Sequence, residues 1–171
     1  MNNSDKAQIK QHRTVVYLDC DGVLANFNLG FEQRFGESPG SYEEKHGPKQ
    51  FWHVIRTAGD FYQSLPLMHD AMELFSAVEH LRPIILTGCP FGGWAELQKM
   101  RWRDKYFPGI PMVTCMSKNK RDYCKPGDFL IDDYLKYRDL WIEAKGTFIH
   151  HTSAEDSIRQ LKDWGVLYDH L

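Results

Sequence analysis

From residue 67 onward, short apolar runs of strand type alternate with longer stretches in which apolar residues recur at helical spacing. In this part the strand-type runs lie at 83–87, 111–115, 128–133 and 147–149, and the helical stretches at 69–81, 94–106, 134–144 and after Ser153. An earlier run of strand type lies at 14–18. Such alternation is typical of parallel β-α-β units. Strands that are apolar at successive positions suit a sheet covered on both faces. The sequence therefore predicts an α/β fold with a three-layer, Rossmann-like parallel sheet.

Residues 25–66 differ from this pattern because they are rich in aromatic residues and carry turn signals at Ser38-Pro39-Gly40 and Gly47-Pro48. We expect them to form a small helical cap insertion after the first strand. Residues 13–24 and 67–171 then make up the α/β core, and a chain of 171 residues is long enough for one such core. Residues 1–12 contain few apolar side chains and are expected to form a flexible N-terminal tail.

The charge balance limits the partners that we expect. Lys and Arg number 21 and Asp and Glu number 23, so the formal net charge is −2. This gives no electrostatic reason to expect polymeric nucleic acid or a membrane as partner. The longest uncharged run, 83–95, is too short to span a bilayer, and the first residues lack the apolar stretch of a signal peptide. Four cysteines without CxxC spacing favour a reducing compartment. We therefore expect a cytoplasmic protein with a small-molecule substrate, and a homodimer stays open.

Polar residues follow the predicted strands at the points where the strands end. Ligands of open parallel sheets bind beyond these carboxyl ends. Carboxylates crowded at one edge repel one another unless a cation lies among them, and oxygen ligands of this kind suit Mg²⁺. A lysine and a threonine hydroxyl could then hold an anionic group, such as a phosphate, against the metal. The residues concerned are Asp19, Asp21, Thr87, Gly88, Asp132 and Asp133, with Lys118, Lys120 and Lys125 in the loop after the third strand.

Four segments of this set resemble the motifs of the haloacid dehalogenase (HAD) superfamily of phosphohydrolases, in the same order. They are 19–24 (DCDGVL), 86–88 (LTG), a lysine near 120 and 130–133 (LIDD). A narrower resemblance is to the 5′(3′)-deoxyribonucleotidases. It extends over about residues 14–135 and includes 18–27 (LDCDGVLANF), Phe51-Trp52, 65–67 (LPL) and 127–133 (GDFLIDD).

The resemblance implies a Mg²⁺-dependent phosphatase that hydrolyses nucleoside monophosphates, with pyrimidine deoxyribonucleotides as expected substrates. Asp19 would be the nucleophile that forms an aspartyl phosphate, and Asp21 the general acid and base. The metal ligands would be Asp19, the backbone carbonyl of Asp21, and Asp132 and Asp133. The phosphate-binding residues would be Gly22, Thr87, Gly88, Lys99 and Lys120. The nucleobase would lie against Phe27, Phe51 and Trp52.

Several points stay open at this level. The family often has serine where this chain has Gly88, which removes one hydroxyl from the phosphate site. Lys118 and Lys125 compete with Lys120, and such a basic run is also typical of a solvated surface. Either Asp132 or Asp133 could ligate the metal directly, and the pair could instead cap the next helix. The three cap aromatics could simply pack in the core of the insertion.

Alternative functions use the same residues. A phosphatase of the same superfamily could act on another monoester, such as a sugar phosphate or a nucleic-acid 3′-phosphate. A dehalogenase would share Asp19 but would not need a second acid two residues later. A catalytically idle scaffold that binds a partner protein would not need the full set of acids. The base and sugar preference and the 5′ or 3′ position of the phosphate do not follow from the sequence.

Overall fold

The structure, a computed structural model, describes residues 13–168. Its centre is a parallel sheet of five strands in the order β3-β2-β1-β4-β5. The strands are β1 (Val16–Leu18), β2 (Ile84–Gly88), β3 (Met112–Cys115), β4 (Phe129–Asp132) and β5 (Thr147–His150). Because β1 pairs with both β2 and β4, the loops that follow these three strands meet at the middle of one sheet edge.

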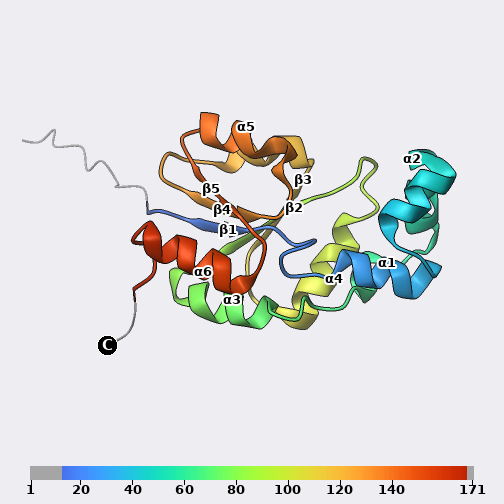
Figure 1. The fold of residues 1–171 in the computed structure, drawn as a ribbon, viewed down its shortest axis with the longest axis horizontal. Coiled ribbons are helices and arrows are strands. Elements are labelled where there is room, and N and C mark those ends of the chain that lie inside the picture. Colours follow the sequence, from blue (N-terminus) through green and yellow to red (C-terminus); the bar gives the residue numbers. More distant parts are fainter. Residues whose placement is uncertain (1–12, 169–171) are drawn as a thin grey trace, which may run out of the picture.

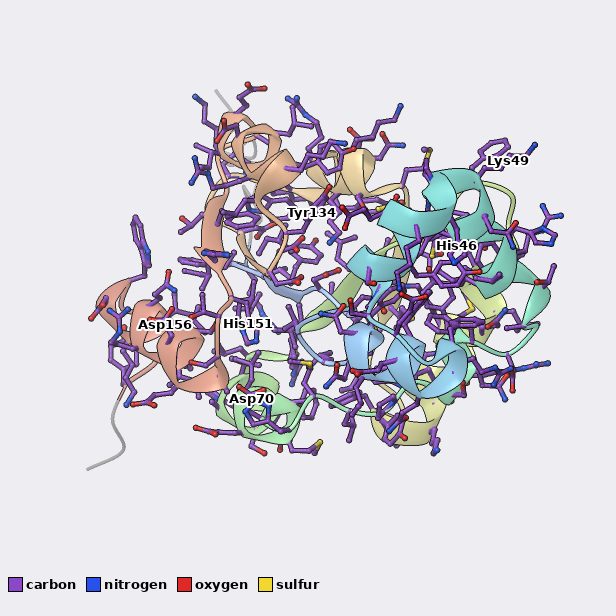
Figure 2. All side chains as sticks on the ribbon, turned by 45° about the vertical axis from the view of Figure 1, so that its right-hand side comes forward. His46, Lys49, Asp70, Tyr134, His151 and Asp156 are labelled. Atoms are coloured by element: carbon purple, nitrogen blue, oxygen red, sulfur yellow. The ribbon has the colours of Figure 1, made fainter. Side chains whose placement is uncertain are left out.

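Helices cover both faces of the sheet (Figure 1). On one face lie α3 (Ala71–Val78), α4 (Glu96–Tyr106) and α6 (Ala154–Asp163), and on the other lie the short α5 (Arg138–Glu143) and the 3-10 helix η3 (Ser117–Tyr123). The 3-10 turn η2 (Glu79–Leu81) extends α3, and the 3-10 turn η4 (Leu135–Tyr137) precedes α5. Asp70, just before α3, accepts a hydrogen bond from the backbone N–H of Ala154 at 2.7 Å, which ties α3 to α6 (Figure 2).

Neighbouring side chains of a strand enter two separate apolar cores because they point to opposite faces of the sheet. Leu18 and Ile131 belong to the larger core, which α3, α4 and α6 complete. Tyr17 and Leu130 belong to the smaller core on the other face, where the ring of Tyr17 meets that of Trp141 edge-on at 5.5 Å. Burial on both sides explains why these strands are apolar at successive positions.

Between β1 and α3 the chain forms α1 (Phe27–Phe35), α2 (Pro39–Thr57) and the 3-10 turn η1 (Tyr62–Ser64). Helix α2 is broken at Gly47, whose φ of 79° is left-handed and which Pro48 follows. The helices are held together by aromatic packing, for example of Phe31 on Phe51 at 5.2 Å. In Figure 1 these helices lie at one end of the molecule, away from α5 and α6.

The predicted fold class is confirmed: the protein is an α/β fold with a five-stranded parallel sheet flanked by helices. The stretch 134–144 is less regular than expected, because it begins as a 3-10 turn and becomes α-helical only at Arg138. The expected flexible tail, 1–12, lies outside the described residues. Within residues 13–168, no helix is long and apolar enough to cross a bilayer.

Candidate active site

Lys120 joins two carboxylates at the carboxyl ends of the central strands. Its ammonium group donates to Asp19 Oδ1 and to Asp132 Oδ2, each at 2.7 Å, and all three side chains are buried. Asp132 Oδ1 accepts a further hydrogen bond from the backbone N–H of Tyr134. Among residues 13–168, no protein donor is bonded to Asp19 Oδ2. Asp19 is therefore held through one oxygen while the other stays available at the cleft.

Asp133 completes a group of carboxylates with Asp19 and Asp132. Each of these residues offers one oxygen, and the three oxygens lie within 4.8 Å of one another. Burial, followed by the charge of Asp19, raises the pKa of Asp132 to about 6. Asp133 is exposed as a whole, but its carboxylate lies so close to Gly22 that any side chain there would overlap it. Desolvation and the charges of Asp19 and Asp132 raise its pKa to about 7.

Gly22 is needed for its backbone shape as well as its small size. Its φ of 84° lies in the left-handed region, and its N–H donates to the carbonyl of Ala25 at 2.8 Å. The turn after β1 thus brings the backbone of Gly22 against the Asp133 carboxylate. Gly22 is among the residues expected to bind phosphate, and its amide proton is used inside this turn.

Asp21 is paired with a lysine from a different element. Lys99 of α4 is 1% exposed, and its ammonium group donates to Asp21 Oδ2 and to Thr87 Oγ1, the latter at 2.9 Å. The ammonium also lies 4.5 Å from the centre of the Tyr62 ring. Although burial alone would lower the pKa of Lys99, the charge of Asp21 raises it above its usual value. Burial raises the pKa of Asp21, and Lys99 opposes that shift.

At the end of β2, Ser117 of η3 fills the space into which a side chain at position 88 would extend. A side chain at position 88 would overlap Ser117 Oγ. The hydroxyl that the resemblance led us to expect at position 88 is therefore supplied at nearly the same place by η3. Ser117 lines the cleft together with Gly88. The sequence analysis missed Ser117, although the glycine at position 88 was a signal that a hydroxyl could come from elsewhere.

A cleft of about 960 Å³ connects these groups with the cap helices. Asp19, Asp21, Gly22, Lys120, Asp132 and Asp133 line it on the core side, whereas Thr87 and Lys99 lie beneath its floor. Tyr134 faces it from the core side, opposite the helix that carries His46 and Lys49 (Figure 2).

The three cap aromatics line the cleft in different degrees. Phe51 is 6% exposed and packs on Phe31, and Phe27 is half-buried against other rings of the cap. Trp52 is 42% exposed. Phe27 and Phe51 thus pack in the cap and also line the cleft, whereas Trp52 lines the cleft with a larger part of its side chain open to the solvent.

The three candidate lysines are placed differently. Lys120 is 6% exposed and lies between the carboxylates, whereas Lys118 lines the cleft from an exposed position. Lys125 is exposed and does not line the cleft; its backbone N–H donates to Asp128 at 2.9 Å. The structure thus brings Lys120 to the acidic group and leaves the other two lysines at the surface.

Comparisons with known proteins agree with this fold. No family model matches the sequence, and no curated protein matches it. Among solved structures, a hydrolase from Streptococcus pneumoniae TIGR4 superposes with a TM-score of 0.56 at 13% identity, over 89% of this chain and 100% of that one. This similarity shows a shared fold.

Two further structures are more distant. A HAD-superfamily hydrolase from Ehrlichia chaffeensis has a TM-score of 0.49 at 12% identity, covering 89% of this chain and 97% of that one. A HAD family hydrolase from Deinococcus radiodurans R1, with bound phosphate and sodium, has a TM-score of 0.49 at 14% identity, covering 91% and 98%.

Proposed function

We propose that the protein is a Mg²⁺-dependent phosphoric monoester hydrolase of the 5′(3′)-deoxyribonucleotidase type, with nucleoside monophosphates as substrates. The observation that carries this proposal is the carboxylate–ammonium cluster of Asp19, Lys120 and Asp132 at the carboxyl ends of β1 and β4. Positioning and charge stabilisation dominate phosphoryl transfer, and a preorganised cluster of this kind supplies both.

In the proposed reaction, Asp19 attacks phosphorus through the oxygen that Lys120 leaves unbound. The bond between phosphorus and the leaving oxygen breaks, and Asp21 gives its proton to that oxygen. Asp21 then takes a proton from the water that cleaves the aspartyl phosphate. Burial raises the pKa of Asp21, which favours the protonated form. Its Oδ1 is buried and has no hydrogen-bond partner among residues 13–168.

The acidic group fits a divalent cation. Three carboxylate oxygens within 4.8 Å of one another are costly to hold in the charged form, as the raised pKa values of Asp132 and Asp133 indicate. Asp19, Asp132 and Asp133 would hold the ion, while the Asp21 side chain is occupied by Lys99. Bound Mg²⁺ would offset charge on the phosphoryl oxygens. Lys120 would hold the nucleophile, and Ser117 would donate to the phosphate.

The nucleoside part of the proposal depends on the other side of the cleft. A volume of about 960 Å³ is at the upper end of the usual range for small-molecule sites. Phe27, Phe51 and Trp52 line it opposite the carboxylates. Aromatic faces can stack on a nucleobase and contribute about 1–3 kcal/mol per base. A base bound there would leave its phosphate near Asp19.

The test is phosphate release from a substrate panel with Mg²⁺ and with EDTA. The panel holds dUMP, dTMP, dGMP, UMP, 3′-dTMP, glucose 6-phosphate and a 3′-phosphorylated oligonucleotide. We expect metal-dependent turnover that favours the deoxynucleotides over UMP and glucose 6-phosphate and is lost in Asp19→Asn. Turnover of glucose 6-phosphate alone would keep the chemistry and contradict the substrate class. No turnover of any compound by folded protein with Mg²⁺ would contradict the proposal.

A further inference from the structure

A second groove adjoins the cleft on its cap side. It has a volume of about 1000 Å³ and lies between the second half of α2 and the loop that connects β2 with α4. Figure 1 shows this loop extending from the sheet toward the cap helices. Trp52, Pro90 and Phe91 line both the groove and the cleft. The two spaces are therefore neighbours that share these three residues as lining.

The wall that α2 contributes is a stripe along one side of the helix. Lys49, His53 and Arg56 follow one another at spacings of four and three residues, with Trp52 beside them, so their side chains share one face. This is not the face that packs inward, because the buried residues of α2 are Phe51 and Ile55. We call Lys49, Trp52, His53 and Arg56 the cap stripe.

The cap stripe is positively charged and its charges are not neutralised by neighbours. No Asp or Glu lines the groove. Among residues 13–168, neither Lys49 nor Arg56 takes part in an ion pair, whereas Lys45 on the same helix is paired with Glu37 at 2.5 Å. Arg56 follows Lys49 by seven positions, which is about 10 Å along a helix. A ligand with negative charges spaced along its length matches these two cations better than a single phosphate does.

Aromatic rings alternate with these cations. Trp52 is 42% exposed and lies on the helix between Lys49 and Arg56. Phe91, on the opposite loop, is 87% exposed, and Trp94 lines the groove beyond it. Exposed apolar rings beside a row of cations are the combination by which proteins bind single-stranded nucleic acid: the cations follow the backbone while the rings stack on bases.

We infer that this groove binds a single-stranded nucleic acid segment whose phosphorylated end reaches the cleft. The inference rests on the proposed phosphatase function and extends its substrates from mononucleotides to short strands: the phosphate is removed from the end of the strand, and the nucleotides behind it lie along the cap stripe. A free mononucleotide would fill the cleft alone.

The binding test uses fluorescein-labelled hexathymidylate with a terminal phosphate, at its 3′ or 5′ end in separate experiments. The protein is the Asp19→Asn variant, which leaves the phosphate in place, and the readout is fluorescence anisotropy. We expect K49A/R56A to weaken binding at least tenfold. The slope of log K against log salt should fall by about 1.4, because each phosphate contact on a single strand contributes about 0.7.

The matched control removes two positive charges elsewhere. R159A/K162A lies on α6, at the opposite end of the molecule from α2 (Figure 1), and should leave both the affinity and the slope unchanged. Polyglutamate of equal charge and a nucleoside 3′,5′-bisphosphate serve as competitors. Equal loss in the two double variants would overturn the inference. Displacement by polyglutamate as readily as by unlabelled strand would also overturn it, in favour of an acidic peptide. Equal displacement by the bisphosphate would favour a single extra phosphate.

Kinetics separate this inference from the function on which it rests. With the otherwise wild-type protein, KM for phosphate release from the hexamer should lie at least tenfold below that for dTMP, and K49A/R56A should abolish this difference without changing dTMP turnover. If dTMP is turned over and K49A/R56A does not change KM for the hexamer, the inference about the groove is wrong and the phosphatase function stands. If K49A/R56A weakens binding of the hexamer but no substrate releases phosphate, the phosphatase function is wrong and binding in the groove stands.

Discussion

The two sides of the cleft hold charge in opposite ways. On the core side, the buried Lys120 is bonded to Asp19 and Asp132, which are also buried. The buried Lys99 is bonded to the buried Thr87 and to the half-buried Asp21. On the cap side, Lys49 and Arg56 are exposed and unpaired among the described residues. A buried charge that loses its partner is strongly destabilising, whereas a surface charge contributes little to stability. Core-side substitutions that leave a buried charge without a partner should therefore change both stability and chemistry, and substitutions on the cap side should change binding alone.

The largest effect is expected at the nucleophile. Asp19→Asn should lower kcat on the order of 10⁴-fold, because loss of a nucleophile abolishes the covalent route. The amide oxygen can still accept from Lys120, so the melting temperature should change little. The matched control is Asp122→Asn, an exposed position on η3. Retained activity of Asp19→Asn in single-turnover assays would show that the buried cluster is structural.

Removal of the buried cation should show most clearly that the core side couples stability to chemistry. Lys120→Met leaves Asp19 and Asp132 without their shared donor, and we expect it to lower the free energy of unfolding by about 3 kcal/mol. Lys118→Met, two residues earlier and exposed, should have almost no effect. Urea denaturation measures both. Mg²⁺ should recover part of the loss, since a ligand that binds only the folded state stabilises it. Equal denaturation midpoints for the two variants would contradict the assigned contacts.

The pH dependence of the stability of the metal-free protein tests how closely Asp19, Asp132 and Asp133 lie together. The pKa of Asp132 is about 6 in the folded protein and 3.8 as its ordinary value. Between these values the folded state binds more protons than the unfolded state, so stability falls as pH rises through this range. In EDTA, the unfolding free energy should be about 2 kcal/mol lower at pH 7.5 than at pH 4.5 from this group alone. Mg²⁺ should remove most of the difference at pH 7.5. Stability that rises with pH in EDTA and is unaffected by Asp132→Asn would contradict this description.

The sequence predicted the core side far better than the cap side, for a physical reason. Strand periodicity places Asp19 and Asp132 at one sheet edge, because the carboxyl ends of parallel strands meet there. The cap stripe gave no such signal, since polar residues on the outer face of a helix look the same whether they bind water or a ligand. The net charge of −2 is an average that hides a local basic groove. As an average, it gives no reason to expect nucleic acid as a partner, whereas the groove proposed above would bind it.

Contacts between elements far apart in the sequence were also beyond prediction. Lys99 reaches Asp21 only because α4 turns its polar residues Gln98 and Lys99 inward, so its buried face does not follow an apolar pattern. Similarly, nothing in the sequence shows that Ser117 lies against Gly88, 29 positions earlier. Such pairs follow from packing of helices against the sheet and not from the periodicity of either segment.

The Gly88–Ser117 pair offers a test of whether one hydroxyl serves the phosphate site. Ser117→Ala should lower kcat/KM about tenfold, which corresponds to one hydrogen bond to a charged group. Gly88→Ser should also lower activity, because its side chain overlaps Ser117 Oγ. The exchange Gly88→Ser with Ser117→Gly should restore activity to within about threefold, since it moves the hydroxyl and removes the overlap. An exchange variant as impaired as Ser117→Ala would show that the position of the backbone, and not the hydroxyl alone, matters.

The smallest effect is expected at Trp52, where the comparison between the two sides is sharpest. If the cap side only binds, Trp52→Ala should raise KM for dTMP about fivefold, because stacking on a base contributes about 1 kcal/mol or more. The kcat for p-nitrophenyl phosphate, which has no nucleobase, should stay unchanged. The melting temperature should also stay close to that of the wild type, since Trp52 is 42% exposed and contacts Phe51 edge-on. Trp164→Ala, which removes an indole that is 62% exposed next to α6, is the matched control and should leave KM unchanged. A Trp52→Ala variant that melts several degrees lower with an unchanged KM would show that Trp52 stabilises the cap and does not bind the base. The distinction between a core side that determines stability and a cap side that only binds would then be wrong for this residue.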